Sequence, residues 1–274
     1  MRIPAAQYRR SALHIPGRRH LAAGLLVILG LVAPSGIAVA EEPDALSAVC
    51  GVPGDMVASP HGVPRTLGKL RRGEAVRIVA IGSSSTFGTG ASARSASYPS
   101  RLEASLERLF PQSSITVVNR GVPGDTSTGM VARFRRDAVE TKPDLIIWQT
   151  GTNSALGRSD IDQFARDVHQ GIAMARSAGI EIMLMGPQFA PRFEAAPNRM
   201  AYVEKLRAIA AAERIPMFPR YQIMRHWIQT GQFTLATMIG RDGLHLTDQS
   251  YACTGWLVAR MISGAGSATA HAGR

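Results

Sequence analysis

The chain is poor in cysteine and in aromatic residues. Only two of its 274 residues are Cys, and Phe, Trp and Tyr together account for 6%. Neither cysteine has the neighbours of a nucleophilic thiolate, which argues against cysteine-based catalysis. The basic residues are scattered and are not interleaved with aromatic residues, so the sequence lacks the pattern of a nucleic-acid-binding surface. We therefore expect no nucleic-acid partner.

Three motifs are also missing. There is no Gly-x-Ser-x-Gly, which argues against an ordinary α/β-hydrolase. There is no second His-containing ligand cluster, so a metal site is not expected. Residues 88–93 (Gly-Thr-Gly-Ala-Ser-Ala) begin several positions after the preceding predicted strand. No clear ribose-binding acid follows them at the expected distance, which argues against a dinucleotide site. We therefore expect no cofactor.

One long uncharged segment is present, at residues 21–40, and five arginines but no acids precede it. Pro34 and Gly36 interrupt its end, and Ala-Val-Ala then precedes Glu41, which is typical of a secretory signal peptide cleaved after Ala40. An uncleaved membrane anchor is the alternative, because about 20 uncharged residues can span a bilayer. We expect a periplasmic or secreted protein with no stable membrane insertion after cleavage. The formal charge falls from +11 to +6 once the five arginines are removed.

The two cysteines, Cys50 and Cys253, both lie after the predicted cleavage site. An isolated pair in an oxidising compartment predicts a disulfide that joins the N-terminal part of the mature chain to its last helix. Two unrelated buried thiols are the alternative.

Apolar strands alternate with helices from residue 74 onward, which predicts one catalytic domain over residues 74–263. The predicted strands are 76–81, 115–119, 144–149, 180–185 and 215–218. The predicted helices are 100–110, 128–141, 161–177, 198–213, 221–230 and 247–262. Residues 41–73 show little periodicity and predict an N-terminal extension wrapped on the surface, and residues 264–274 predict a disordered tail. The alternation predicts an α/β fold, a three-layer α/β/α sandwich with a mostly parallel five-stranded sheet.

Polar and small residues follow the predicted strands where a parallel sheet places its sites, beyond the carboxyl ends of the strands. Residues 82–86 (Gly-Ser-Ser-Ser-Thr) follow the first strand, and a turn of small residues there would leave the hydroxyl of Ser84 exposed. Such a run alone more often satisfies backbone groups or holds a phosphate. Ser83 and Ser85 are alternatives to Ser84 as the nucleophile.

A base for this serine is present near the C-terminus, in residues 242–245 (Asp-Gly-Leu-His). A serine hydroxyl needs a neighbouring base to accept its proton, and histidine suits that role near neutral pH. A carboxylate three residues earlier, Asp242, can bind the far ring nitrogen of His245 and fix its tautomer. By itself, this spacing is more often a turn before a capped helix.

Donors for a developing negative charge are also available. Gly124 lies in residues 119–125 (Asn-Arg-Gly-Val-Pro-Gly-Asp), and Asn153 follows Gly151 and Thr152 after another strand. A glycine N–H, an Asn amide and the Ser84 N–H could together bind an oxyanion. The alternative is that the glycines only shape a turn and that Asn153 caps the following segment.

The order and spacing of these four elements resemble the SGNH (GDSL-type) hydrolase superfamily. The resemblance covers residues 74–263 and implies a flavodoxin-like fold with Ser84 as nucleophile, His245 as base and Asp242 as its orienting acid. It also implies an oxyanion hole made by Ser84, Gly124 and Asn153. The chain departs from the family at two positions, where Ser83 and Ser154 replace the usual acids.

The sequence therefore predicts an exported serine esterase or acylhydrolase that cleaves carboxylic esters through an acyl-enzyme. We expect the substrate to be a small molecule or a glycan or lipid ester. The alternatives are an O-acyltransferase or a glycan deacetylase using the same site. A non-catalytic surface-binding protein of the same fold is a further alternative, because a fold does not prove an activity.

Overall fold

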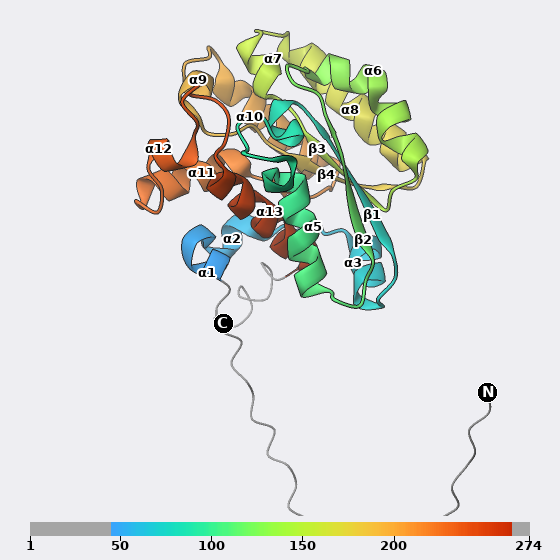
Figure 1. Ribbon diagram of the computed structural model, residues 1–274. Coiled ribbons are helices and arrows are strands. Elements are labelled where there is room, and N and C mark those ends of the chain that lie inside the picture. Colours follow the sequence, from blue (N-terminus) through green and yellow to red (C-terminus); the bar gives the residue numbers. More distant parts are fainter. Residues whose placement is uncertain (1–44, 265–274) are drawn as a thin grey trace, which may run out of the picture. The chain divides into compact units, whose positions relative to one another are not determined.

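The computed structural model describes residues 45–264. At its centre is a five-stranded sheet, parallel throughout, with strand order β2-β1-β3-β4-β5 (Figure 1). The strands are β1 (Val76–Gly82), β2 (Ile115–Gly121), β3 (Leu145–Gln149), β4 (Glu181–Met185) and β5 (Met217–Phe218). This confirms the predicted α/β class and parallel sheet.

The central strands are apolar because helices cover both of their faces. Every residue of β3 is buried, and in β1 Arg77 alone is exposed. Strand β2 is an edge strand and alternates less regularly, with Arg120 in an exposed position. Strand β1 pairs with β2 on one side and with β3 on the other. The sheet therefore changes its direction of winding at β1, and parallel sheets bind their ligands at such a point.

Helices form a layer on each face of the sheet (Figure 1). One layer contains α5 (Tyr98–Leu109) and α13 (Asp248–Ser263), and the other contains α6 (Ser127–Asp137), α8 (Ile161–Ser177) and α10 (Arg199–Ala212). In α8, Phe164, Val168 and Ile172 are spaced at helical intervals and face the core, as their periodicity predicts. Trp148 of β3 packs against this layer, with Gly171 of α8 allowing its ring to approach closely.

The predicted bounds of the long helices and strands agree with the structure to within a few residues. The elements that differ from the prediction are short. Strand β5 is shorter than predicted because Pro216 and Pro219, which have no N–H, flank Met217–Phe218. Helix α11 (Arg220–Gln229) follows β5. The helix predicted at 128–141 is divided into α6 and a short 3-10 turn, η2 (Val139–Thr141). Within residues 74–263, five short elements were not predicted: α4 (Ser84–Phe87), η1 (Arg94–Ala96), α7 (Thr152–Leu156), α9 (Pro191–Glu194) and α12 (Leu235–Met238).

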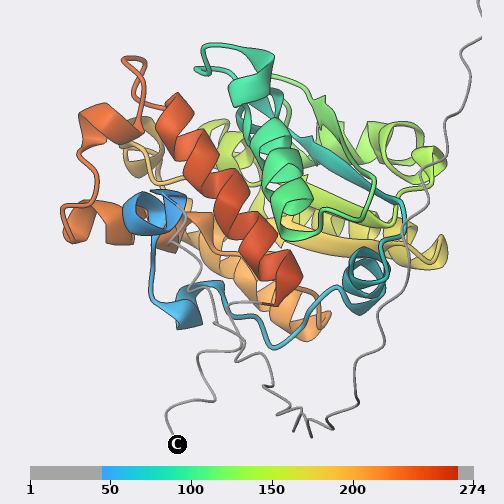
Figure 2. The ribbon, with the colours of Figure 1, turned by 60° about the horizontal axis from the view of Figure 1, so that its bottom comes forward.

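Residues 45–73 are more ordered than the sequence suggests. They form α1 (Ala45–Cys50), α2 (Gly54–Val57) and α3 (Pro64–Arg71), and α1 and α2 lie beside α13 (Figure 2). Four side chains of this segment, Cys50, Val57, Val63 and Leu70, are buried in the core. The segment is therefore packed into the domain as well as lying over it.

The structure contains the predicted disulfide. Cys50 at the end of α1 is bonded to Cys253 in α13, with 5.2 Å between their Cα atoms. The indole N–H of Trp227 also donates to the carbonyl oxygen of Cys50, at 3.3 Å. These two contacts fasten α1 to the helices that follow the sheet.

The predicted signal peptide at residues 1–40 and residues 265–274 of the predicted tail lie outside the described residues. Within residues 45–264, none of the helices has both the length and the apolar character needed to cross a bilayer.

Candidate active site

The carboxyl end of β1 presents a serine at the start of a short helix. Ser83 is the N-cap of α4 and Ser84 is its first residue, which is 7% exposed. Because the first N–H groups of a helix have no partner in the preceding turn, the backbone N–H of Ser84 is directed out of the helix. The sequence predicted an exposed turn here, and the structure shows a single helical turn instead.

The side chains of Ser84, His245 and Asp242 form a continuous hydrogen-bonded chain. The Nε2 atom of His245 lies 2.8 Å from the Oγ atom of Ser84, and the Nδ1 atom of His245 contacts the Oδ2 atom of Asp242. The side chain of His245 is 14% exposed, whereas that of Asp242 is 43% exposed. These are the three residues that the sequence proposed as nucleophile, base and orienting acid.

The loop of Asp242 is held in shape by its own backbone. The Oδ1 atom of Asp242 accepts hydrogen bonds from the backbone N–H groups of Leu244 and His245, each at 3.0 Å. Ile239 and Leu246 form an antiparallel bridge that closes the base of the loop. Burial acts to raise the pKa of Asp242, but the hydrogen bonds from His245 and Leu244 outweigh it and hold the pKa at about 2. Asp242 is therefore a carboxylate at any ordinary pH.

The three serines of residues 83–85 point to different partners. The Oγ atom of Ser83 donates to the Oε1 atom of Gln149 at 3.1 Å, and that of Ser85 lies 3.5 Å from the Oε1 atom of Gln188. Only Ser84 contacts His245. Gln149 also accepts from the N–H of Ser83 at 2.9 Å, so the last residue of β3 fixes the start of α4. The hydrogen bonds thus favour Ser84 over its two neighbours as the nucleophile.

Gly124 and Asn153 come from the neighbouring strand ends. Pro123 and Gly124 are the central residues of a turn in which the N–H of Asp125 donates to the carbonyl oxygen of Val122 at 3.2 Å. Gly124 has a φ of +81°, which a turn with Pro followed by Gly requires. Asn153 lies in α7 just after β3, and its Nδ2 atom donates to the carbonyl oxygen of Asp125 at 2.9 Å. This bond ties the two proposed oxyanion donors together.

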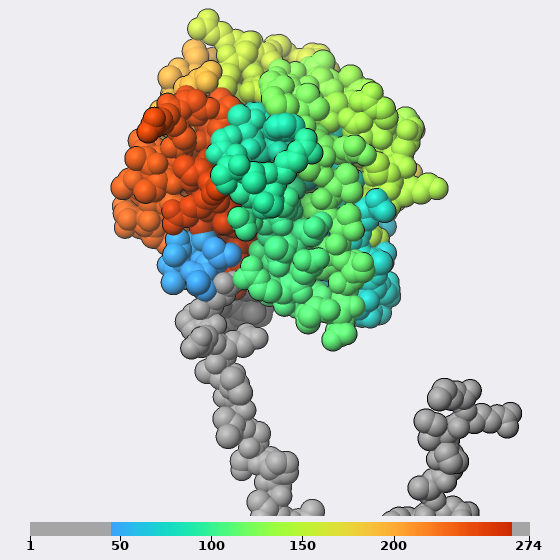
Figure 3. Space-filling view, viewed as in Figure 1, coloured from blue at the N-terminus to red at the C-terminus, as the bar shows by residue number. Residues whose placement is uncertain are grey.

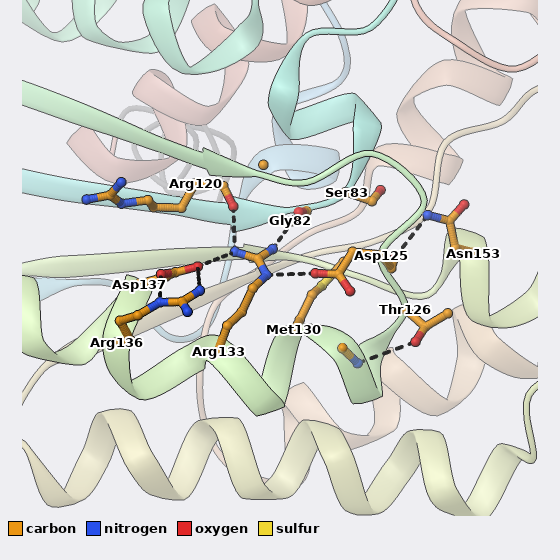
Figure 4. Close-up of polar contacts among 12 residues, drawn as sticks. Gly82, Ser83, Arg120, Asp125, Thr126, Met130, Arg133, Arg136, Asp137 and Asn153 are labelled. Carbon is orange, nitrogen blue, oxygen red and sulfur yellow. Dashed lines mark hydrogen bonds and ion pairs between the residues drawn. The ribbon is translucent and has the colours of Figure 1, made fainter.

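A partly buried arginine holds the Gly124 turn in place (Figure 4). The guanidinium of Arg133 binds the carboxylate of Asp125 at 2.7 Å and the carbonyl oxygen of Gly82 at 3.0 Å. It also binds the carbonyl oxygen of Arg120 at 2.9 Å and the carboxylate of Asp137 at 3.0 Å. One side chain thus joins the ends of β1 and β2 to the turn. This role of Arg133 was not predicted from the sequence, because it depends on the carbonyl oxygen of Gly82, which is 51 residues away in the chain.

One of the two departures from the family pattern has a structural counterpart. Ser154 stands where the family has an acid, and its Oγ atom lies 3.3 Å from that of Ser127. A carboxylate reaches the same place from α8: Asp167, which is buried, accepts from Ser127 at 2.8 Å and from Thr128 at 2.7 Å. The start of α6 therefore has a carboxylate partner although position 154 does not supply it.

The segment after α4 packs against the C-terminal part of the site. In Figure 3 the teal surface of this segment lies directly against the orange surface of the C-terminal segment. The hydroxyl of Tyr251 donates to the carbonyl oxygen of Thr89 at 2.7 Å, and the N–H of Ser92 donates to Asp248 at 2.8 Å. Residues 88–93, whose glycines raised the question of a dinucleotide site, therefore pack against the His245 loop and the start of α13.

Two pockets adjoin these elements. The first has a volume of about 530 Å³ and mainly apolar walls, and it lies between the start of α9, helix α12 and the loop that carries Asp242. It is lined by Pro191, Leu235, Ala236, Ile239, Gly240, Arg241, Gly243 and Thr247. The second has a volume of about 260 Å³ and lies beside α4 and the end of β2. It is lined by Phe87, Arg94, Ser97, Ser100, Asn119 and Gly121.

No group of three or more His, Cys, Asp or Glu side chains within residues 45–264 is arranged to hold a metal ion. Four polar side chains that support the site were not predicted from the sequence: Arg133, Gln149, Gln188 and Arg220. Each lies in a predicted helix or strand or in a loop, and nothing in its local pattern distinguishes it from a surface residue.

The sheet and the placement of the motifs agree with one class of protein, the SGNH (GDSL-type) hydrolases. The chain belongs to the non-GDSL lipase-like family, whose profile matches residues 49–267. The resemblance seen in the sequence is thereby confirmed.

Three comparisons describe its relatives. The chain is 29% identical to an esterase, TesA, of Pseudomonas aeruginosa over 133 residues, which cover 47% of this chain and 60% of TesA. It is 30% identical to an acetylxylan esterase of Geobacillus stearothermophilus over 88 residues, 32% of this chain and 36% of that enzyme. The structure resembles that of a lipase/acylhydrolase from Enterococcus faecalis, with a TM-score of 0.59, 24% identity and coverage of 69% and 96%. The two sequence matches thus cover about three fifths of the length of TesA and about a third of the length of the acetylxylan esterase.

Proposed function

We propose that this protein is an exported serine esterase that cleaves carboxylic esters through an acyl-enzyme. Ser84 is the nucleophile, His245 the general base and Asp242 the residue that orients the base. The observation that carries the proposal is the hydrogen-bonded chain from Ser84 through His245 to Asp242 at the carboxyl end of β1. The family and the esterase relatives support the same chemistry.

The reaction begins when the Oγ atom of Ser84 attacks the ester carbonyl carbon while His245 Nε2 accepts its proton. The carbonyl oxygen becomes an oxyanion, which accepts hydrogen bonds from the backbone N–H groups of Ser84 and Gly124 and from the side chain of Asn153. When the tetrahedral intermediate collapses, the carbon–oxygen bond to the alcohol breaks and His245 returns the proton to the departing alcohol. The acyl group remains on Ser84.

Water completes the cycle. His245 removes a proton from a water molecule, whose oxygen attacks the acyl carbon and forms a second oxyanion at the same donors. Collapse then releases the carboxylic acid, and the proton returns from His245 to Ser84. Asp242 does not exchange a proton in either half, because its pKa of about 2 keeps it ionised.

Export is supported by the segment at residues 1–40 and by the disulfide between Cys50 and Cys253. The acyl part of the substrate fits the apolar pocket beside the Asp242 loop, where Leu235 is 43% exposed. A pocket of about 530 Å³ suits a short acyl chain.

Removal of acetyl groups from a glycan is a second candidate. The pocket beside α4 combines an aromatic ring, Phe87, with polar side chains including Arg94 and Asn119, and Phe87 is 41% exposed. Sugars bind to surfaces of this kind, with one apolar face on a ring and hydroxyls on polar groups. One relative of the chain is an acetylxylan esterase.

Hydrolysis of p-nitrophenyl esters of increasing acyl length tests the proposal, with the mature protein beside Ser84→Ala. We expect Ser84→Ala to lose nearly all activity, whereas Ser113→Ala, at the opposite end of the sheet, retains it. A fluorophosphonate probe should label the wild type, and peptide mapping should place the label on Ser84. Equal background turnover by the wild type and Ser84→Ala, with no labelling of either, would refute the proposal. Acetylated xylan and an added alcohol acceptor distinguish the deacetylase and acyltransferase alternatives.

A further inference from the structure

A buried polar cluster lies directly beneath the candidate active site. Its centre is Gln188, in the loop after β4, and Arg220, the first residue of α11. Gln188 is 1% exposed and Arg220 is 0% exposed. Neither residue belongs to the proposed nucleophile, base or oxyanion hole.

Gln188 makes four hydrogen bonds, and three of them reach immediate neighbours of site residues. Its Oε1 atom accepts from Thr152, the neighbour of Asn153, at 2.8 Å and lies 3.5 Å from the hydroxyl of Ser85, the neighbour of Ser84. Its Nε2 atom donates to the carbonyl oxygen of Leu244, the neighbour of His245, at 3.3 Å. One amide group therefore joins the nucleophile helix, the oxyanion helix and the base loop.

The orientation of this amide follows from its fourth partner. The Nη2 atom of Arg220 lies 2.8 Å from the Oε1 atom of Gln188, and a guanidinium can only donate hydrogen bonds. The amide oxygen must therefore face Arg220, which leaves the amide nitrogen to face the carbonyl oxygen of Leu244. The direction of the link to the base loop is thus determined by Arg220.

Arg220 holds the loop of Gln188 at two points. Besides its bond to Gln188, its Nε atom donates to the carbonyl oxygen of Gly186 at 3.0 Å. Arg220 forms no ion pair with a carboxylate among residues 45–264, and its Nη1 atom has no hydrogen-bond partner there. Burying a guanidinium without a carboxylate partner is unfavourable for stability. The burial of Arg220 therefore needs a reason other than stability, and its effect on the orientation of Gln188 supplies one.

We propose that Gln188, oriented by Arg220, is a positioning residue that sets the distance between Ser84, Asn153 and His245. The proposal rests on the esterase function proposed above. Gln188 acts through the backbone of Leu244 on the ring of His245 and through Thr152 on the amide of Asn153. It does not contact the reacting atoms.

Gln188→Glu separates this role from a purely structural one. The carboxylate keeps an acceptor for Thr152 and for Arg220, and it gives Arg220 the ion pair that it lacks. However, it places an oxygen against the carbonyl oxygen of Leu244, where the wild type has a donor. Because Arg220 lies beside the new carboxylate and keeps it ionised, that repulsion persists across the working pH range. Thermal stability should therefore be kept while the base loop is displaced.

The measurements are kcat, KM and the rate of fluorophosphonate labelling, together with the unfolding temperature. For Gln188→Glu we expect kcat and the labelling rate to fall by about tenfold or more, because small errors in the placement of reacting groups are costly. KM should stay within about twofold, and the unfolding temperature should not decrease. Gln188→Met, which removes all four hydrogen bonds, should lose kcat similarly and also unfold at a lower temperature.

Thr66→Val is the matched control. Thr66 is fully buried and donates to Glu181 at 2.7 Å, but it lies at the opposite end of the sheet. Its loss should lower the unfolding temperature and leave kcat and the labelling rate unchanged. A Gln188→Glu variant with wild-type kcat and labelling rate would overturn the proposal. A wild type that neither hydrolyses esters nor takes the label would instead refute the esterase function itself, and the positioning role with it.

Discussion

The backbone of Gly90 approaches His245 so closely that it leaves no room for a side chain at position 90. A Cβ atom added at Gly90 would lie 3.0 Å from the Cβ atom of His245 and 2.7 Å from the carbonyl oxygen of Leu246. Gly90 also has a φ of +93°, a conformation that favours glycine. The backbone at residue 90 is therefore packed so tightly beside the proposed base that a side chain at this position would clash.

We expect Gly90→Ala to displace His245 and to lower kcat by on the order of tenfold or more, because the ring must meet Ser84 at hydrogen-bond distance. Gly179→Ala is the control for the backbone effect alone. Gly179 has a φ of +69°, but no atom lies within 4 Å of the added Cβ. Both variants should lose about 1 kcal/mol of stability from the left-handed conformation. Equal kcat values in the two variants would show that the contact with His245 does not matter.

The long elements of this fold could be predicted from the sequence because each is specified locally. Helix α8 has the predicted bounds of 161–177, since its apolar residues recur at helical spacing and Asp160 caps its start by accepting from Gln163. The helices of residues 45–73 could not be predicted in the same way. They have only four to eight residues each, too few to show a helical period, and they are held by contacts such as Cys50 with Cys253 that span the whole domain.

The same distinction applies to the residues of the candidate site. Ser84, His245 and Asp242 belong to short motifs whose proposed chemistry can be recognised from the sequence without the fold. Gln188 and Arg220 are buried polar residues whose partners are brought together only by the sheet, so their composition suggests a surface location. The positions proposed to carry the chemistry could therefore be named from the sequence, whereas the residues that hold them in place could not.

Asn153 provides a test of the oxyanion hole. We expect Asn153→Ala to lower kcat by on the order of a hundredfold or more with a smaller effect on KM, because the amide donates to charge that develops in the transition state. The variant also loses the 2.9 Å hydrogen bond to the carbonyl oxygen of Asp125. Ser113→Ala controls for that loss, since Ser113 donates to the carbonyl oxygen of Leu70 at the same distance, far from the site. If both variants keep full kcat, Asn153 is not an oxyanion donor.

The disulfide should make a large contribution to stability. It closes a loop of 203 residues, which in the chain-entropy model corresponds to about 5 kcal/mol. We expect the free energy of unfolding in urea to fall by up to that amount in the double variant Cys50→Ala/Cys253→Ala, and reductant should destabilise the wild type but not the variant. Thiol titration of the denatured, unreduced protein should find no free thiol. Two free thiols would show that the bond does not form.

The carboxylate of Asp242 makes stability depend on acid in a defined direction. Its pKa is about 2 in the folded protein, whereas an unperturbed Asp titrates near pH ~3.9. The unfolded chain therefore binds a proton before the folded one does. The stabilisation is complete above about pH 4, and it is lost as the pH falls toward 2.

We expect the free energy of unfolding to decrease more steeply between pH 4 and 2 in the wild type than in Asp242→Asn, so that the two proteins converge at the acidic end. At pH 7 the same substitution should lower kcat strongly, on the order of a thousandfold, because an amide does not fix the tautomer of His245 as a carboxylate does. Urea unfolding at several pH values and ester hydrolysis at pH 7 measure the two effects separately. Parallel stability curves for the two proteins from pH 7 to 2 would contradict the lowered pKa, whatever the effect on kcat.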